Sequence, residues 1–195
     1  PDVVVYAFMP NDFEQDEGHA AEQAFLNDLV LDRQHTGHPT WKLPPWIGWS
    51  GLAVLVAERI RTARVSAGTR AWYSGMTGPG NEGGWARTKG DLERMDRASR
   101  AAGARFVVAI LPLLVGLEGD GGRYPFRGLH EDVGRACEDL SIEHVDLLPA
   151  LIGHEARDLW VHPVDMHPND LAHSLIARAL LPVVAEAIEA GGEGP

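Results

Sequence analysis

Short apolar runs alternate along this chain with longer segments in which apolar residues recur every three or four positions. The runs at residues 3–8 and 105–111 are continuous, which predicts strands buried on both faces of a sheet. A shorter apolar segment at residues 143–147 is interpreted as a third strand. The periodic segments predict helices, at residues 14–33, 50–64, 85–102, 126–140 and 169–190. This alternation predicts an α/β fold with a parallel sheet.

The helical periodicity also predicts which residues face the core. In the helix at 50–64 the inward face is Leu52, Leu55, Val56 and Ile60, with Ser50 as the N-cap. In the helix at 85–102 the inward residues are Leu92, Met95 and Ala98, and Gly103 ends the helix. The acidic helix at 14–33 has an apolar stripe of Ala20, Ala21, Ala24, Phe25 and Leu29.

The first strand poses a problem for a sheet of only three strands. Parallel sheets are covered on both faces and are usually wider, and a strand at residues 3–8 would expose unpaired backbone groups. Natural proteins avoid such edges, which favour self-association. The chain also begins at Pro1 directly in strand-like sequence. We therefore expect further strands before Pro1, with residues 1–195 forming the C-terminal portion of a single domain.

Composition excludes several classes of function. The net charge of −11 over 195 residues argues against a nucleic-acid interface and against docking on anionic lipid. No apolar run has the length of a membrane span, so no span is expected. The single Cys137 excludes an internal disulfide and a Cys-rich zinc site, and we expect it to be a small buried residue. The compartment stays open between the cytoplasm and export.

Two segments carry candidate chemistry. Asp165 and His167 are predicted to lie on one tight loop before the last helix, where a carboxylate can orient an imidazole that acts as a general base. Asn11 follows the first strand, at the edge of a parallel sheet where ligands bind, and its amide can donate to an oxyanion. The simpler interpretation makes Asn11 a turn residue and makes Asn169 or Asp170 the N-cap of the last helix.

Other candidates are weaker. Ser50 lies in Gly48-Trp49-Ser50-Gly51, but no strand precedes it, so the strand–turn–helix context of a nucleophilic serine is lacking. Three tryptophans lie within a Pro- and Gly-rich segment and would form either a lid or a packed surface loop, Trp41, Trp46 and Trp49.

Together these segments resemble the SGNH (GDSL-like) hydrolases. The third sequence block of that family, Gly-x-Asn-Asp, corresponds to Met9-Pro10-Asn11-Asp12, with Met in place of Gly. The fifth block, Asp-x-x-His followed by Pro-Asn, corresponds to Asp165-Met166-His167-Pro168-Asn169, with Asp and His one residue closer. The middle of the chain is also similar, in Gly103 to Pro112, Tyr124-Pro125-Phe126 and Val145 to Pro149.

The resemblance implies a serine esterase or lipase on a three-layer α/β/α flavodoxin-like fold, acting on small acyl or acetyl esters without a cofactor. His167 would be the general base, Asp165 its orienter and Asn11 an oxyanion donor. Asp170 and His173 have the usual family spacing but fall inside the last helix, so we interpret them as structural. The family's nucleophilic Ser and a second oxyanion Gly precede the Asn block, so we expect both before Pro1.

Two other interpretations stay open. A metal-dependent hydrolase could use the cluster of His162, Asp165, His167 and His173, although this spacing matches no common zinc motif. A non-catalytic binding domain could keep the fold without the chemistry, because a fold does not fix a function.

Overall fold

The three predicted strands form one parallel sheet. In the computed structural model, which describes residues 1–24, 50–163 and 165–191, the sheet contains β1 (Val3–Phe8), β2 (Arg105–Ile110) and β3 (Glu143–Asp146). The strand order is β1-β2-β3. Val3 pairs with Arg105 and Phe8 with Ile110, while β3 pairs with the second half of β2, from Val107 to Ile110. The α/β class and the parallel sheet are therefore confirmed.

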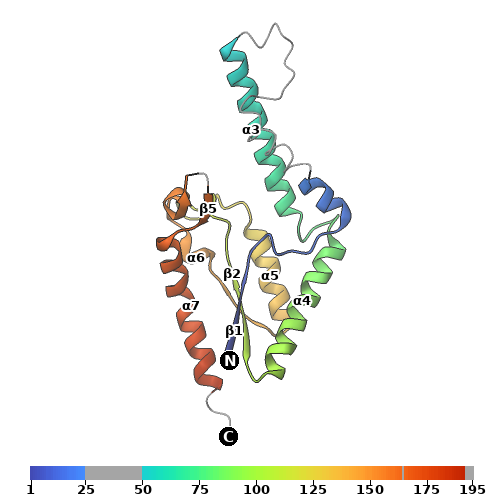
Figure 1. Cartoon of the computed structure of the whole chain (residues 1–195), viewed down its shortest axis with the longest axis vertical. Coiled ribbons are helices and arrows are strands. Elements are labelled where there is room, and N and C mark those ends of the chain that lie inside the picture. Colours follow the sequence, from blue (N-terminus) through green and yellow to red (C-terminus); the bar gives the residue numbers. More distant parts are fainter. Residues whose placement is uncertain (25–49, 164, 192–195) are drawn as a thin grey trace. The chain divides into compact units, whose positions relative to one another are not determined.

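Helices lie on both faces of this sheet. Figure 1 shows α7 (Asp170–Gly191) on one side and α4 (Glu82–Ala101) with α5 (Arg127–Asp139) on the other. Helix α7 contacts β1 and β2, whereas α5 contacts β2 and β3. Short turns of helix after β3 complete this part, α6 (Leu148–Leu151) and the 3-10 helix η1 (Ala156–Leu159). The bounds of α5 agree with the prediction within one residue at each end, and α4 begins three residues earlier than predicted.

The centre of the sheet is fully buried. Val107, Val108, Ala109 and Ile110 of β2 are each at most 2% exposed, because helices cover both faces of the middle strand. Cys137 of α5 is completely buried, and burial raises the pKa of its thiol to about 12. This confirms its interpretation as a small core residue.

The prediction that residues 3–8 are buried on both faces is wrong. Val5 is 37% exposed and Ala7 is also exposed, while Phe8 is buried. The reason is topological: β1 is the terminal strand of the sheet, and among the described residues no strand pairs with its outer edge. Continuous apolar sequence thus identifies the strand correctly but not its position in the sheet.

By the distribution of its contacts the chain divides into two compact units. The first unit comprises Pro1–Glu14 and Gly83–Pro195, and the second comprises Gln15–Glu82. In the second unit residues 17–24 are helical, and α3 (Gly51–Ser74) extends ten residues beyond the predicted end. The Ser50 side chain accepts a hydrogen bond from the Ala53 N–H at 3.3 Å, which confirms Ser50 as the N-cap. Phe25, Leu29 and the three tryptophans Trp41, Trp46 and Trp49 lie outside the described residues.

The predicted inward face of α3 is wrong as a burial assignment. Leu52, Leu55, Val56 and Ile60 share one face of the helix, as expected, but they are 48–70% exposed. Helical periodicity predicts which residues lie on the same face, whereas burial depends on what packs against that face. The other end of α3 is better anchored, because the Trp72 indole N–H donates to the His19 carbonyl at 3.0 Å and the two rings stack.

Helix α7 contains a longer apolar segment than expected, because the sequence predicted no membrane span. Its segment Asp170–Glu189 is long and apolar enough to cross a membrane, by length and composition alone, and little of it is buried. This is weak evidence, because helices that cover a sheet can have the same composition. Helix α7 begins as predicted after Asn169 and continues through Pro182 to Gly191.

Candidate active site

The segment Asp165-Met166-His167-Pro168 is a strand, not the loop that the sequence predicted. It forms β5 (Asp165–Pro168), which pairs antiparallel with β4 (Trp160–His162). The hairpin is tied to the rest of the fold by the Trp160 indole N–H, which donates to the Leu114 carbonyl at 2.8 Å. Leu114 follows the carboxyl end of β2, so the hairpin lies at that end of the sheet (Figure 1).

The strand conformation explains how Asp165 and His167 can pair although they are one residue closer in sequence than in the family block Asp-x-x-His. Residues two apart in a strand point to the same face, so Asp165 and His167 lie side by side while Met166 points away. The His167 Nδ1 atom lies 2.5 Å from the Asp165 Oδ1 atom. The same carboxylate oxygen accepts a hydrogen bond from the backbone N–H of His167 at 3.1 Å. The pair predicted from the sequence is therefore assembled, by strand geometry.

The electrostatics of the pair fit a base and its orienter. The side chains of His167 and Asp165 are 82% and 47% exposed. Hydrogen bonds from the His167 side chain and then its backbone lower the pKa of Asp165, so the carboxyl group stays ionised at neutral pH. An ionised Asp165 that accepts from Nδ1–H leaves the other ring nitrogen, Nε2, as an acceptor facing solvent. That is the arrangement of an imidazole ready to remove a proton from a hydroxyl group.

Asn169 has the structural role that the simpler interpretation gave it. Its Oδ1 atom accepts a hydrogen bond from the Ala172 N–H at 3.1 Å, which caps the first turn of α7. Its Nδ2 group donates to the carbonyls of Asp158 and Trp160. Asn169 thus fixes the end of β5 against the start of α7 and holds the hairpin in place.

Asn11 occupies an exposed turn at the end of β1. The turn is closed by the Asp12 N–H, which donates to the Met9 carbonyl at 2.9 Å, and by the Met9 N–H, which donates to the Asp12 carboxylate. Asn11 is therefore a turn residue, as its simpler interpretation said, and its side chain is also accessible to a ligand. Among the described residues it makes no hydrogen bond to Asp165 or His167.

The topology nevertheless brings Asn11 and the hairpin to one edge. Strands β1 and β2 are neighbours and parallel, so their carboxyl ends meet on the same side of the sheet. Asn11 follows β1 by three residues, and the hairpin is anchored at Leu114, four residues after β2. Asn11 and the hairpin therefore lie at the same edge of the sheet.

No serine in the described part of the chain is hydrogen-bonded to His167. Ser50 caps α3, and the Ser99 hydroxyl donates to the Met95 carbonyl within α4. Ser141 has a backbone φ of 55° in the turn between α5 and β3. The remaining serines are exposed on helices, Ser66, Ser74 and Ser174. Among the described residues, the Asp165–His167 pair thus has no serine hydrogen-bonded to its imidazole.

The geometry does not support the metal-site alternative. Within residues 1–24, 50–163 and 165–191, no three His, Cys, Asp or Glu side chains come together as metal ligands. His162 lies opposite Asp165 in the hairpin, but His173 is exposed on α7, and His162, Asp165, His167 and His173 form no common site. Asp170 and His173 likewise make no hydrogen bond to each other among these residues.

A second imidazole–carboxylate pair, which the sequence did not predict as a unit, joins the buried His130 to Asp146, whose side chain is 37% exposed. His130 of α5 is 4% exposed; its Nδ1 atom lies 2.7 Å from the Asp146 Oδ1 atom, and its Nε2 atom lies 3.1 Å from the Tyr124 hydroxyl oxygen. The Leu113 N–H donates to that same hydroxyl oxygen at 3.1 Å. Both nitrogens of the buried His130 ring therefore have partners, as expected of an imidazole that stabilises the fold. The sequence does contain one indication that His130 is buried. It lies on the same face of its helix as Val133 and Cys137, which follow it by one and two turns.

Changing His130 to alanine is expected to lower the free energy of unfolding by about 2 to 3 kcal/mol. The substitution removes the partner of Asp146 and leaves the Tyr124 hydroxyl group without an acceptor in the core. Urea unfolding followed by circular dichroism measures the change. His173→Ala, at an exposed position, is the control and should shift the free energy by no more than about 0.5 kcal/mol. Equal effects of the two variants would show that the buried network contributes little.

The same network predicts a dependence on pH. Burial favours the neutral form of Asp146, but hydrogen bonds from His130 and the Leu148 N–H outweigh it and lower the pKa of Asp146. A group whose pKa is lowered on folding stabilises the protein above its unfolded pKa of about 4 and loses that contribution as the pH falls. The stability difference between wild type and Asp146→Asn should therefore be larger at pH 7 than at pH 3.

The candidate site is thus a solvent-facing Asp165–His167 pair with Asn11 at the same edge of a parallel sheet. Comparisons of the chain with protein family models, with curated proteins and with solved structures give no match.

Proposed function

We propose that this chain is part of a serine esterase of the SGNH type, with His167 as general base, Asp165 as its orienter and Asn11 as an oxyanion donor. The observation that carries the proposal is the hydrogen bond between Asp165 and His167 Nδ1, which leaves Nε2 open to solvent at the carboxyl end of the sheet. An imidazole in this state takes the proton from a serine hydroxyl as that oxygen attacks an ester carbonyl.

The proposed reaction proceeds through an acyl-enzyme. The serine oxygen attacks the carbonyl carbon of the ester while His167 Nε2 accepts the serine proton. The negative oxygen of the tetrahedral intermediate accepts hydrogen bonds, one of them from the Asn11 amide. His167 then gives its proton to the leaving alcohol, and a water molecule activated by the same nitrogen releases the acid. Asp165 stays ionised throughout and stabilises the imidazolium.

The nucleophilic serine in this proposal comes from sequence outside residues 1–195. The family order of motifs places the serine before the Asn block, and no described serine is hydrogen-bonded to His167. The corresponding fold would be a three-layer α/β/α, flavodoxin-like domain, and the substrate a small acyl or acetyl ester that needs no cofactor. In this account α7 covers the sheet and does not span a membrane.

Asn11 provides a test of the oxyanion role. In the full gene product, Asn11→Ala is expected to lower kcat for a short-chain aryl ester about 10²- to 10³-fold with little change in KM, because its donor acts on the developing charge. Asn11→Asp keeps the size of the side chain but replaces the donor with an acceptor, so it should lose as much activity. Full activity in Asn11→Asp would contradict the donor role.

A non-catalytic binding domain is the second candidate, and the observation that favours it is the lack of a serine beside His167 in the described residues. In that case the carboxyl edge of the sheet would hold a ligand without turning it over. The two functions differ in one measurable respect, since only the esterase loses turnover when His167 is changed.

A further inference from the structure

The hairpin of β4 and β5 is held by a loop that follows β2, residues 113–125. The Trp160 indole N–H of β4 donates to the Leu114 carbonyl of this loop at 2.8 Å. A second contact reaches the segment that leads into the hairpin, where the Gly153 N–H donates to the Leu117 carbonyl, also at 2.8 Å. Leu114 and Leu117 are at most 5% exposed, so both anchor points lie in the core. The place of the hairpin therefore depends on the conformation of the loop.

The two ends of this loop are joined by the side chain of Tyr124. Its hydroxyl oxygen accepts a hydrogen bond from the Leu113 N–H at 3.1 Å. Gly116 lets the two ends approach closely, because its φ is 64° and a Cβ atom added there would lie 3.1 Å from the Arg123 carbonyl oxygen. Since Leu114 directly follows Leu113, the hydroxyl group of Tyr124 also fixes the carbonyl that binds the hairpin.

The Tyr124 hydroxyl group is itself held by His130 of α5. Burial raises the pKa of Tyr124, so the hydroxyl group keeps its proton. The oxygen already accepts from Leu113, and it lies 3.1 Å from His130 Nε2. His130 Nδ1 lies 2.7 Å from the carboxylate of Asp146, so in the neutral imidazole Nδ1 carries the proton and Nε2 accepts the hydroxyl proton of Tyr124. Each donor in this series thus has one acceptor.

Asp146 connects the series to the sheet. It is the last residue of β3, where it pairs with Ile110 of the buried strand β2. Burial favours its neutral form, but hydrogen bonds from His130 and from the Leu148 N–H lower the pKa of Asp146, so the carboxyl group is ionised at neutral pH. The series therefore runs from the sheet through α5 to the loop, and from the loop to the hairpin.

Tyr124 is the member that can be altered with the least change in packing. Its ring makes edge contacts with Phe126 and with the His130 imidazole, with ring centroids 5.9 and 5.5 Å apart. Tyr124→Phe keeps these contacts and removes only the hydroxyl group. The loop then loses its hydrogen bond to α5, while His130 keeps its partner Asp146.

We propose that Tyr124 is a positioning residue for the candidate active site. Its hydroxyl group fixes the loop at Leu114 and, through Trp160, holds the hairpin at the sheet edge where Asn11 lies. The inference rests on the proposed esterase function, in which His167 and the oxyanion donor act on the same substrate and their separation decides the rate. His167 and its carboxylate partner belong to the same strand, so a looser loop displaces them together.

The first test compares the kinetics of Tyr124→Phe and wild type in the full gene product. We expect kcat for a short-chain aryl ester to fall about tenfold with little change in KM, because the base is displaced from the reacting atoms. The acidic limb of the pH–rate profile should stay in place, because Asp165 still pairs with His167 within β5. A loss of kcat with a shifted acidic limb would instead indicate damage to that pair and would overturn the positioning role.

Trp160→Phe removes the next link, the indole N–H that binds Leu114. If Tyr124 acts through this link, the two changes are not independent, so the double variant should lose about as much kcat as either single variant. Independent effects would multiply to about a hundredfold and would overturn the proposed route.

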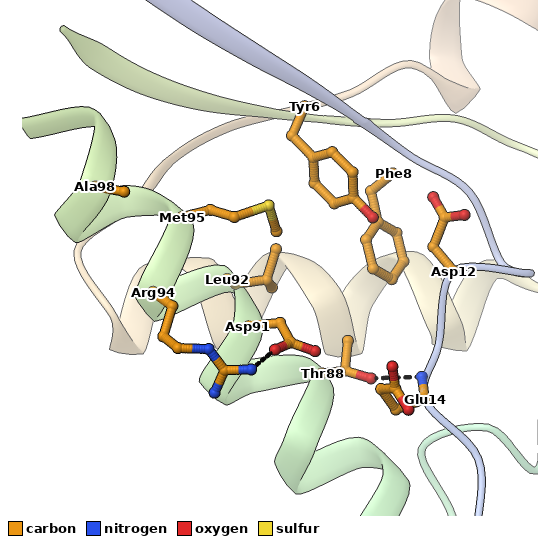
Figure 2. Close-up of a pocket in the computed structure, with 10 residues that line it drawn as sticks. All are labelled: Tyr6, Phe8, Asp12, Glu14, Thr88, Asp91, Leu92, Arg94, Met95 and Ala98. Atoms are coloured by element: carbon orange, nitrogen blue, oxygen red, sulfur yellow. Dashed lines mark hydrogen bonds and ion pairs between the residues drawn. The ribbon is translucent and has the colours of Figure 1, made fainter. Parts of the chain in front are cut away.

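Hydrogen exchange, measured by mass spectrometry, follows the hairpin without any substrate. In Tyr124→Phe the amides of residues 153–169 should exchange at least about tenfold faster, while those of β2 stay protected. Tyr6→Phe is the matched control, since it also removes one buried phenol hydroxyl group. Figure 2 shows Tyr6 in a pocket beside Leu92 and Met95, and the residues that line this pocket come from residues 6–14 and from α4. Tyr6→Phe should therefore leave exchange at residues 153–169 unchanged.

The two kinds of measurement separate this inference from the proposed function. Unchanged exchange at residues 153–169 in Tyr124→Phe would overturn the positioning role, whether or not the protein hydrolyses esters. Faster exchange with an unchanged kcat would overturn it as well, because the reaction would then not depend on where the hairpin is held. A wild-type protein without ester hydrolysis would contradict the esterase proposal, and the exchange comparison would still decide whether Tyr124 holds the hairpin.

Discussion

Replacing His167 with alanine in the full gene product is expected to lower kcat/KM for a short-chain aryl ester by about 10⁴-fold or more. The imidazole removes the proton from the nucleophile and returns it to the leaving alcohol, so its loss stops both halves of the reaction. The exposed position of His167 means that the change should leave the free energy of unfolding within about 0.5 kcal/mol of the wild-type value.

Two exposed histidines nearby are matched controls. His162 lies across the hairpin from Asp165, and His173 lies on the first turns of α7. His173→Ala should retain full activity, and His162→Ala should retain most of it, because the hydrogen bond that orients the proposed base runs from Asp165 Oδ1 to His167 Nδ1. An equal loss in all three variants would indicate a general disturbance of the hairpin, and unchanged turnover in His167→Ala would exclude it as the base.

Changing Asp165 to asparagine is expected to lower kcat about 10³- to 10⁴-fold, with little effect on KM. An amide at this position can donate to Nδ1 and thereby favour the wrong tautomer of His167, and it cannot stabilise the imidazolium. The pH–rate profile gives a second measure, because loss of the carboxylate should shift its acidic limb.

Asp158→Asn is the control for this change, since Asp158 is exposed on η1 close to the hairpin and its side chain has no part in the proposed mechanism. It should keep both kcat and the shape of the pH–rate profile. If Asp165→Asn behaved like Asp158→Asn, the hydrogen bond at 2.5 Å would be a local contact in the hairpin without a role in orienting a base.

The sequence predicted the strands better than their surroundings. Six apolar residues in succession identified Val3–Phe8 to the residue, because an unbroken run rich in β-branched and aromatic residues is typical of a strand. The sequence could not indicate that β1 is the terminal strand, since strand order depends on contacts between distant residues. For the same reason Leu52, Leu55, Val56 and Ile60 were assigned correctly to one face of a helix but wrongly to the core.

The candidate site shows the same division between local and long-range information. The Asp165–His167 pairing was predicted from residue types, and the strand that assembles it was not, because a four-residue strand in a short hairpin has little sequence signal. The hydrogen-bond network of the buried His130 with Asp146 and Tyr124 was missed because its members lie on three separate segments. Both imidazoles pair with a carboxylate, and only exposure to solvent, known from the fold, separates a candidate base from a structural residue.

The most direct test of the central claim is labelling with a fluorophosphonate probe, which reacts with activated serines. The 195-residue chain and the full gene product are labelled in parallel, and the modified residue is located by mass spectrometry. The proposal predicts that only the full gene product is labelled, at a serine outside residues 1–195, and that His167→Ala abolishes the labelling. Labelling at a serine within residues 1–195, or no labelling of either protein, would contradict it.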